Sequence, residues 1–188
     1  MVALQEERAR GPFVAVESAE AVDPDDLLAL VQPGEIVDFV GAIPALGDPW
    51  QVLEREWIAQ MHASVQLDVA SGPEIRALDA DDADAMLALT RLVYPSYYRP
   101  RTRELGSYIG IFENGRLAAM AGERLRFGPW QEISAVCTHP DHLGRGHAQR
   151  LVATLVNAIL ARDERPFLHV SNQNQRAIGV YQRLGFSK

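Results

Sequence analysis

The segment from Glu132 to Gly146 constrains the fold of this chain more than any other part of the sequence. Its apolar first half is typical of a buried strand, Pro140 marks a turn, and two glycines then lead directly into an amphipathic pattern. Gly144 and Gly146 allow the backbone to turn several N–H groups towards one point, and the positive end of a following helix favours negative charge there. The sequence therefore predicts a strand–loop–helix unit that binds an anion such as a pyrophosphate.

Regular elements are expected on both sides of this unit. Asn114-Gly115 between two apolar runs indicates a tight β-hairpin, and a further turn leads from it into the strand of the unit. Strands that flank a crossover helix normally lie parallel and adjacent in one sheet. The predicted elements are strands over 105–112, 116–126, 131–138 and 166–170, and helices over 146–162 and 175–184.

Residues 1–72 are expected to form a mixed α/β extension that packs on a second domain comprising residues 73–188. The turn-forming run Ser71-Gly72-Pro73 sets this boundary, and Asp79 is expected to cap the first helix after it. The elements expected next to the boundary and within the extension are strands over 13–16, 36–40, 65–69 and 74–78, and helices over 24–31 and 49–62.

The segment from Tyr94 to Arg101 is rich in aromatic rings and arginine, and its two prolines keep it out of a helix. Two readings stay open: a loop that crosses the surface, or a wall that binds a substrate. The candidate substrate-binding residues here are Tyr97, Tyr98 and Arg101.

Composition excludes several classes of function. The 188 residues are 47% hydrophobic and 23% charged, as in a globular protein, and the net charge of -7 argues against a nucleic-acid partner. No apolar run approaches the roughly 20 residues of a membrane helix. Cys137 is the single cysteine, which fits a reducing cytoplasm.

His139, His142 and His147 lie close in sequence, but no carboxylate or thiol set completes a site, so no metal is expected.

The run from Val136 to Ala148, Val-Cys-Thr-His-Pro-Asp-His-Leu-Gly-Arg-Gly-His-Ala, followed by Asn174 to Phe186, closely resembles the GNAT acyltransferase superfamily. The resemblance extends from about residue 74 to 186, and the first 70 residues look like the extension of an FR47-like N-acetyltransferase subgroup. The fold that it implies is α/β (α+β), a mixed, mostly antiparallel twisted sheet with flanking helices and an N-terminal extension.

The resemblance implies acetyl-CoA as the cofactor, with its pyrophosphate on the amides of the glycine loop. The pantetheine arm would pair with exposed strand backbone much as an added strand does. Asn174 matches the family asparagine that binds this arm, and Tyr181 matches the tyrosine that protonates the departing thiolate. The implied cofactor-binding residues are Val136, Cys137, Thr138, Leu143, Gly144, Arg145, Gly146, His147, Ala148, Gln149, Asn174, Ala177 and Tyr181.

Two features depart from the family pattern. Asp141 and Leu143 stand where the family often has polar or cationic residues, so weaker phosphate binding is expected, with Arg145 and His147 compensating. The sequence also ends at Lys188, where the family's last strand is expected to begin. That strand would come from further residues or from a partner, or would be absent.

Acyl transfer to an amine needs a base or a water relay near the acetyl carbon. Because side chains alternate along a strand, the even-numbered residues from Glu132 to Thr138 are expected to share the cofactor face. Glu132 is the first candidate base, and burial would have to raise its pKa from about 4.3. Glu123 on the preceding strand and a water relay are the alternatives.

The function expected from these features is direct transfer of an acetyl group from acetyl-CoA to a primary amine of a small molecule, protein or peptide. Glu132 would act as the base and Tyr181 as the acid. The alternative is a catalytically silent acyl-CoA-binding module for regulation or assembly. The expected partners are acetyl-CoA and the amine acceptor, without nucleic acid or membrane, and a homodimer stays open.

Overall fold

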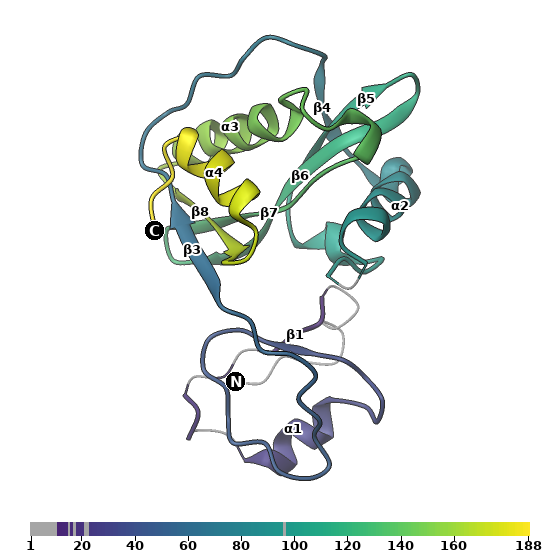
Figure 1. Cartoon of the computed structure of the whole chain (residues 1–188), viewed down its shortest axis with the longest axis vertical. Coiled ribbons are helices and arrows are strands. Elements are labelled where there is room, and N and C mark those ends of the chain that lie inside the picture. Colours follow the sequence, from purple (N-terminus) through teal and green to yellow (C-terminus); the bar gives the residue numbers. More distant parts are fainter. Residues whose placement is uncertain (1–10, 15, 17, 21–22, 96) are drawn as a thin grey trace.

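A six-stranded sheet forms the centre of this computed structural model, which describes residues 11–14, 16, 18–20, 23–95 and 97–188 (Figure 1). Its strand order is β3-β8-β7-β6-β5-β4, and only β7 and β8 pair in parallel. The expected mixed, mostly antiparallel sheet is thus confirmed. The strands are β3 (Ile58–His62), β4 (Ile75–Leu78), β5 (Tyr108–Glu113), β6 (Arg116–Phe127), β7 (Trp130–Thr138) and β8 (Arg165–Ser171).

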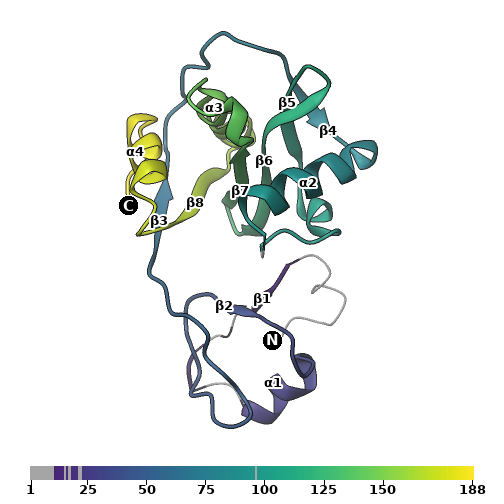
Figure 2. The same ribbon diagram turned by 45° about the vertical axis from the view of Figure 1, so that its right-hand side comes forward.

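Helices cover both faces of this sheet (Figures 1 and 2). α3 (His147–Leu160) and α4 (Gln175–Arg183) lie on one face, and α2 (Ala83–Val93) lies on the other. Burying each large aliphatic side chain of α3 contributes about 1.5–3 kcal/mol. Within the described residues, no helix is long and apolar enough to cross a membrane. The side chains of α3 that pack into the core are Leu151, Val152, Leu155, Val156 and Ile159.

Most of the local predictions from residue 74 onward are confirmed. Asn114 and Gly115 take φ values of 52° and 77°, and they join β5 to β6 in the expected hairpin. Asp79 accepts a hydrogen bond from the amide of Asp81 and caps a short 3-10 turn, Ala80–Asp82, that leads into α2. Gly185, with φ of 92°, follows the end of α4 as a left-handed C-terminal residue.

The helix predicted over 49–62 is wrong, because residues 51–57 are irregular and residues 58–62 form β3. Ala59 and Met61 are buried and alternate with exposed neighbours, which is the two-residue period of a strand with one face on the core. The strand predicted over 65–69 is also wrong. The backbone N–H and C=O of Leu67 in that segment bond instead to the side chain of Asn157 on α3.

β3 occupies the edge of the sheet beside β8, so the division at residue 72 does not separate the strands of the sheet. Ile58 pairs with Ser171 and His62 with Phe167, in antiparallel register. The amide and carbonyl of His62 also bond to Ser187 near the end of the chain. The edge of the sheet beside β8 is therefore formed by a strand from the first third of the sequence, and Ser187 lies against the outer side of that strand.

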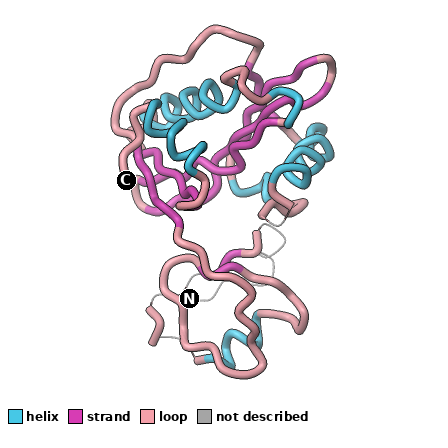
Figure 3. The backbone as a smooth tube through the Cα atoms, viewed as in Figure 1, coloured by secondary structure: helices cyan, strands magenta, loops and turns pink. Residues whose placement is uncertain are grey.

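The segment before β3 forms a small lobe with few regular elements (Figure 3). It contains β1 (Phe13–Val14) and β2 (Asp38–Phe39), which pair in parallel, and the expected helix α1 (Pro24–Leu30), which Asp23 caps. The predicted strands at 13–16 and 36–40 are thus shorter than expected. Residue 15 and residues 1–10 of the predicted extension lie outside the described residues.

Gly122 on β6 gives a test of this packing. A Cβ atom added to Gly122 would overlap the ring of Tyr108, which is 3% exposed and packs edge-on against Tyr98. The Tyr108 hydroxyl also donates to the carbonyl of Thr102, which restrains the ring. We expect Gly122→Ala to lower the free energy of unfolding by about 1–3 kcal/mol, as measured by urea denaturation.

Gly47→Ala is the matched control, since a Cβ atom at Gly47 meets nothing within 4 Å. Its unfolding free energy should stay within about 0.5 kcal/mol of the unsubstituted protein. Equal stabilities for the two variants would contradict the close packing of Tyr108 on β6.

Candidate functional site

β7 and β8 part after only three paired residues. Their parallel register joins Trp130 to Arg165 and ends at the pair of Glu132 with Phe167. Beyond this point β7 continues to Thr138 and β8 to Ser171 without pairing with each other. The two strands therefore diverge at Glu132, and we call the opening between them the mouth. Their facing edges beyond this point are available for another hydrogen-bonding chain.

A β-bulge at Ala135 changes which side chains of β7 share a face. Ala135 has φ of 50°, and the pairing with β6 shifts by one residue there. Past the bulge, Cys137 lies on the face of Glu132, while Thr138 lies on the opposite face. The expectation that Glu132 and Thr138 share a face is wrong, because the extra residue reverses the alternation.

The glycine loop at the far end of β7 leaves the start of α3 without a cap. Gly144 and Gly146 have φ of 79° and 78°, and Gly146 stands at the N-cap position without a side chain to accept from the first turn. Helix starts leave up to four N–H groups in need of an acceptor. These amides, from about residue 146 to 149, form a suitable cradle for phosphate oxygens.

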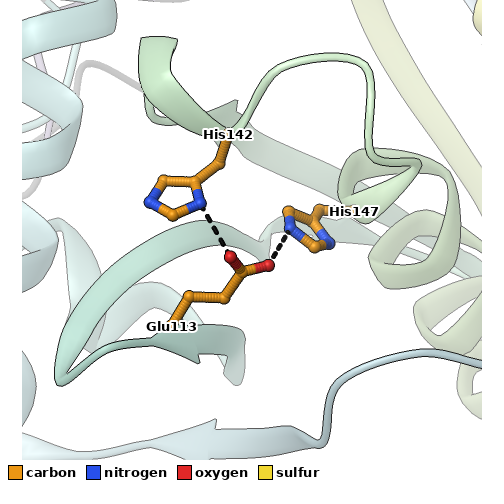
Figure 4. Close-up of side chains that lie close together, drawn as sticks. All are labelled: Glu113, His142 and His147. Carbon is orange, nitrogen blue, oxygen red and sulfur yellow. Dashed lines mark hydrogen bonds and ion pairs between the residues drawn. The ribbon is translucent and has the colours of Figure 1, made fainter.

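Glu113 at the end of β5 lies between two imidazoles of this loop region, as Figure 4 shows. Its Oε2 is 3.0 Å from His142 Nδ1 and 2.5 Å from Arg145 Nη1. Its Oε1 is 2.8 Å from His147 Nε2, although the buried His147 ring does not meet hydrogen-bond geometry with any described residue. Burial acts to raise the pKa of Glu113, but Arg145 and the two imidazoles outweigh it and lower the pKa.

The expectation that no carboxylate completes a histidine set near the loop is therefore wrong. Ligand atoms of Glu113, His142 and His147 lie within 4.8 Å of one another, and Zn²⁺ accepts such a set. However, the Arg145 guanidinium already compensates the charge of the carboxylate. The cluster thus joins the glycine loop to the hairpin of β5 and β6. This engagement also removes Arg145 and His147 from free contact with a phosphate.

Glu132 is the most deeply buried acid among the described residues, with 1% of its surface exposed. Arg124 on β6 donates from Nε to Oε2 at 2.8 Å and from Nη2 to Oε1 at 2.7 Å. His169 on β8 places Nδ1 2.8 Å from Oε1. The other side of the Arg124 guanidinium stacks on Phe13 from β1, with Cζ 4.2 Å from the ring centroid.

The pKa of Glu132 is lowered, whereas a role as the base would have required burial to raise it. Burial is the largest single influence and acts upward, but the hydrogen bonds from His169 and Arg124 together outweigh it. At neutral pH Glu132 is therefore an ionised carboxylate with both oxygens engaged.

The cofactor residues implied on α4 lie at its start and on its buried face. Asn174 caps the helix, since its Oδ1 accepts from the amide of Ala177 at 3.0 Å. Tyr181 is 8% exposed, and burial, followed by the charge of Tyr94, raises the pKa of its phenol. The Tyr181 hydroxyl thus stays protonated and able to donate. Cys137 is buried, which raises the pKa of its thiol to about 12 and keeps it from acting as a thiolate.

The four candidate substrate residues do not come together. Glu123 lies on the face opposite Glu132 and pairs with Arg162 at 3.0 Å. Tyr98 is buried against Tyr108 under α2. Arg101 pairs with Glu104 at 2.8 Å. Tyr97 is exposed and stacks on Phe13, and so it reaches the surroundings of Arg124 and Glu132.

Comparisons with known proteins agree with this arrangement. The family described as FR47-like protein matches residues 108–188. A solved structure from Novosphingobium aromaticivorans, assigned to the GNAT family of acetyltransferases, is 33% identical over 96% of this chain and 81% of its own, with a TM-score of 0.82. This chain belongs to the GNAT family. Among curated proteins, none matches the sequence.

More distant structures share the GNAT fold with this protein. The ribosomal-protein-S18-alanine N-acetyltransferase of Escherichia coli is 21% identical, over 60% of this chain and 76% of its own, with a TM-score of 0.53. AAC(6')-Iy, solved with a bisubstrate analogue, CoA-S-monomethyl-acetylneamine, is 17% identical over 63% of this chain and 92% of its own, with a TM-score of 0.55.

Sequence reasoning missed three polar residues of the site: Glu113, Arg124 and His169. The available signal for His169 is a basic residue within the apolar run of a predicted buried strand, where an unpartnered side chain would be costly. Glu113 and Arg124 gave no comparable signal, because charged residues are ordinary at the ends of hairpin strands.

Replacing Glu132 tests the buried ion pair. Glu132→Gln leaves the Arg124 guanidinium, which is only 12% exposed, without its carboxylate. Removing one member of a buried pair typically costs about 3–5 kcal/mol, so we expect a loss of about 3 kcal/mol in urea denaturation at pH 7.

The loss should depend on pH in one direction. Because the folded-state pKa of Glu132 is lowered, its contribution is complete above the ordinary value of 4.5 and disappears as the pH falls through the folded value. The difference between the two proteins should therefore shrink below pH 4.5. Glu74→Gln, on an exposed residue, is the control and should change stability by no more than about 0.5 kcal/mol.

Proposed function

We propose that this GNAT protein transfers the acetyl group of acetyl-CoA directly to a primary amine of an acceptor. The observation that carries the proposal is the parting of β7 and β8 at Glu132, with the uncapped start of α3 at the other end of β7. An extended ligand with amide groups along its length and a pyrophosphate at one end fits these two features together.

In this proposal the backbone of Val136, Cys137 and Thr138 pairs with the pantetheine arm. The pyrophosphate lies on the amides that run from Leu143 through Gly144, Arg145, Gly146, His147 and Ala148 to Gln149. Backbone groups supply most of this binding, since the side chains of Arg145 and His147 are engaged by Glu113. Asn174 and Ala177 border the arm at the start of α4.

Tyr181 is proposed as the acid that protonates the departing thiolate. Its phenol is held protonated by burial, so it can donate at any pH where an amine is nucleophilic. Transfer would take place within a ternary complex, because the buried thiol of Cys137 is not suited to carry an acyl group.

The acceptor is proposed to be cationic before it reacts. Burial, and then the charges of Asp38, Glu56 and Glu54, raise the pKa of Tyr97, so these carboxylates lie around its phenol. Tyr97 stacks on Phe13, and Phe13 in turn stacks on the guanidinium of Arg124, which bonds to Glu132. These carboxylates would attract an ammonium group to the approach, which the guanidinium of Arg124 also borders.

Turnover should be measured as release of the CoA thiol from acetyl-CoA with a panel of amines. The panel comprises a polyamine, a lysine-containing peptide, a peptide with a free N-terminus and an acidic amino acid. We expect the cationic amines to react and the acidic one to react least. Tyr181→Phe should lower kcat by about 10²-fold or more with unchanged CoA affinity, because only donation to the leaving group is lost.

Binding of CoA without turnover on any amine would contradict the proposed enzyme activity. That result would instead favour a catalytically silent acyl-CoA-binding module. Equal kcat for Tyr181→Phe and the unsubstituted protein would contradict the role of Tyr181 alone.

The place of the pyrophosphate can be tested with a change that does not harm the helix. Gln149→Glu adds a carboxylate to the first turn of α3, where the helix dipole favours negative charge. We therefore expect an unchanged or higher thermal midpoint together with a several-fold weaker affinity for CoA, measured by calorimetry. The loss of affinity should diminish as salt is added, because screening weakens the repulsion.

Gln51→Glu makes the same charge change in an exposed irregular segment and is the matched control. It should leave the affinity for CoA unchanged. If Gln149→Glu and Gln51→Glu bind CoA equally, the pyrophosphate does not lie at the start of α3.

A further inference from the structure

His169 is a polar side chain of the site that has no role in the transfer proposed above. Its side chain is 23% exposed, and its Nδ1 contacts a carboxylate that is itself 1% exposed. We propose that His169 Nε2 is the general base that removes a proton from the acceptor amine, with Glu132 as the positioning residue that orients the imidazole. The inference rests on the proposed function, since it names the base for that same transfer.

The contact with Glu132 determines which nitrogen of the neutral ring carries the proton. An ionised carboxylate can only accept hydrogen bonds, so at 2.8 Å from Oε1 the Nδ1 of His169 must be the donor. The lone pair of the neutral imidazole is then on Nε2. No hydrogen bond joins Nε2 to any residue that the structure describes, which leaves it open to a substrate proton.

The position of His169 in the sheet places it where β7 and β8 diverge, beside the proposed path of the thioester. Glu132 is the last residue of β7 paired with β8, and His169 lies two residues beyond its pairing partner Phe167. The hydrogen bond between Glu132 and His169 therefore spans the mouth where the strands part. A thioester arm lying along the open edge of β7 would end beside this pair.

Glu132 is poorly suited to act as the base itself. Both of its oxygens are engaged by Arg124, and Oε1 also accepts from His169. The lowered pKa of the carboxylate further reduces its affinity for a proton at neutral pH. An imidazole is the side chain that most often serves as a general base near neutral pH. Glu132 thus holds the ring in place, and the imidazole of His169 takes the proton.

The groups around His169 come from each neighbouring strand. β7 contributes the carboxylate of Glu132, which contacts the imidazole directly. β6 contributes the guanidinium of Arg124, which bonds to that same carboxylate. On β3 the register partner is the uncharged Gln60, and on β8 the ring of Phe167 packs edge-on against the imidazole. Further along β8, the Ser171 hydroxyl donates to Glu56.

The proton balance of the step is complete. His169 Nε2 takes one proton from the ammonium form of the acceptor, and the free amine attacks the acetyl carbon to form the C–N bond. When the intermediate collapses, the C–S bond breaks and the sulfur takes a proton from Tyr181. The second proton, lost by the nitrogen as it becomes an amide, restores the phenol. His169 then releases its proton to water.

His169→Asn is the informative variant, because the Asn amide places an N–H donor where Nδ1 stands and lacks Nε2. It keeps the hydrogen bond to Glu132 and removes only the base. With the best amine of the panel, we expect kcat to fall about 10²–10⁴-fold, with the KM for acetyl-CoA unchanged. The acidic limb that a general base gives to a pH–rate profile is expected in the unsubstituted protein and should be absent from the variant.

Added imidazole gives a second readout. It should partly restore the turnover of His169→Ala, which leaves space for a free ring, and it should not accelerate the unsubstituted protein. If His169→Asn keeps the kcat and the acidic limb of the unsubstituted protein, the base assignment is overturned while the proposed function stands. If the unsubstituted protein turns over no amine of the panel, both are overturned.

The tautomer can be measured without turnover. In protein labelled with ¹⁵N-histidine, two-bond proton–nitrogen spectra distinguish Nδ1–H from Nε2–H in the neutral ring. We expect the Nδ1–H form for His169, and we expect this preference to be lost in Glu132→Gln. A neutral ring of the unsubstituted protein that carries its proton on Nε2 would overturn the proposal.

Discussion

The short parallel pairing of β7 and β8 is the constraint on which the rest of the structure depends. Parallel strands normally continue side by side for as long as both are extended, because each unpaired backbone group loses a hydrogen bond. Here the pairing ends after Glu132, and the bulge at Ala135 turns the remainder of β7 towards the glycine loop. One local break therefore produces both the open strand edge and the approach to the helix start.

The break also explains why so much charge is buried beside it. A carboxylate with 1% exposure is costly unless its oxygens are satisfied, and Glu132 receives two hydrogen bonds from Arg124 and one contact from His169. The three groups come from three adjacent strands, β6, β7 and β8. Their geometry is consequently fixed by the sheet, whereas a site on loops would need further support.

The sequence predicts well those features that depend on neighbouring residues. The Asn114-Gly115 turn, the Asp79 cap and the start of α3 at the glycine loop all follow from local backbone chemistry. Features that depend on distant partners were missed. β3 is a strand because β8 lies beside it, and the apolar residues within 49–62 alone also fit a helical stripe. The bulge at Ala135 has no residue signal, since alanine rarely adopts positive φ, and it reversed the predicted face of Thr138.

The position of β3 has a consequence for how the protein folds. Its residues pair with β8, about a hundred residues further along the chain, and with Ser187 near the end. Closing so large a loop is entropically unfavourable and slow, so the edge strand is expected to join late, after the hairpins and helices of residues 74–186 have formed. Until then β8 presents an unprotected edge to other chains. The residues that complete the sheet are thus synthesised first and are in place last.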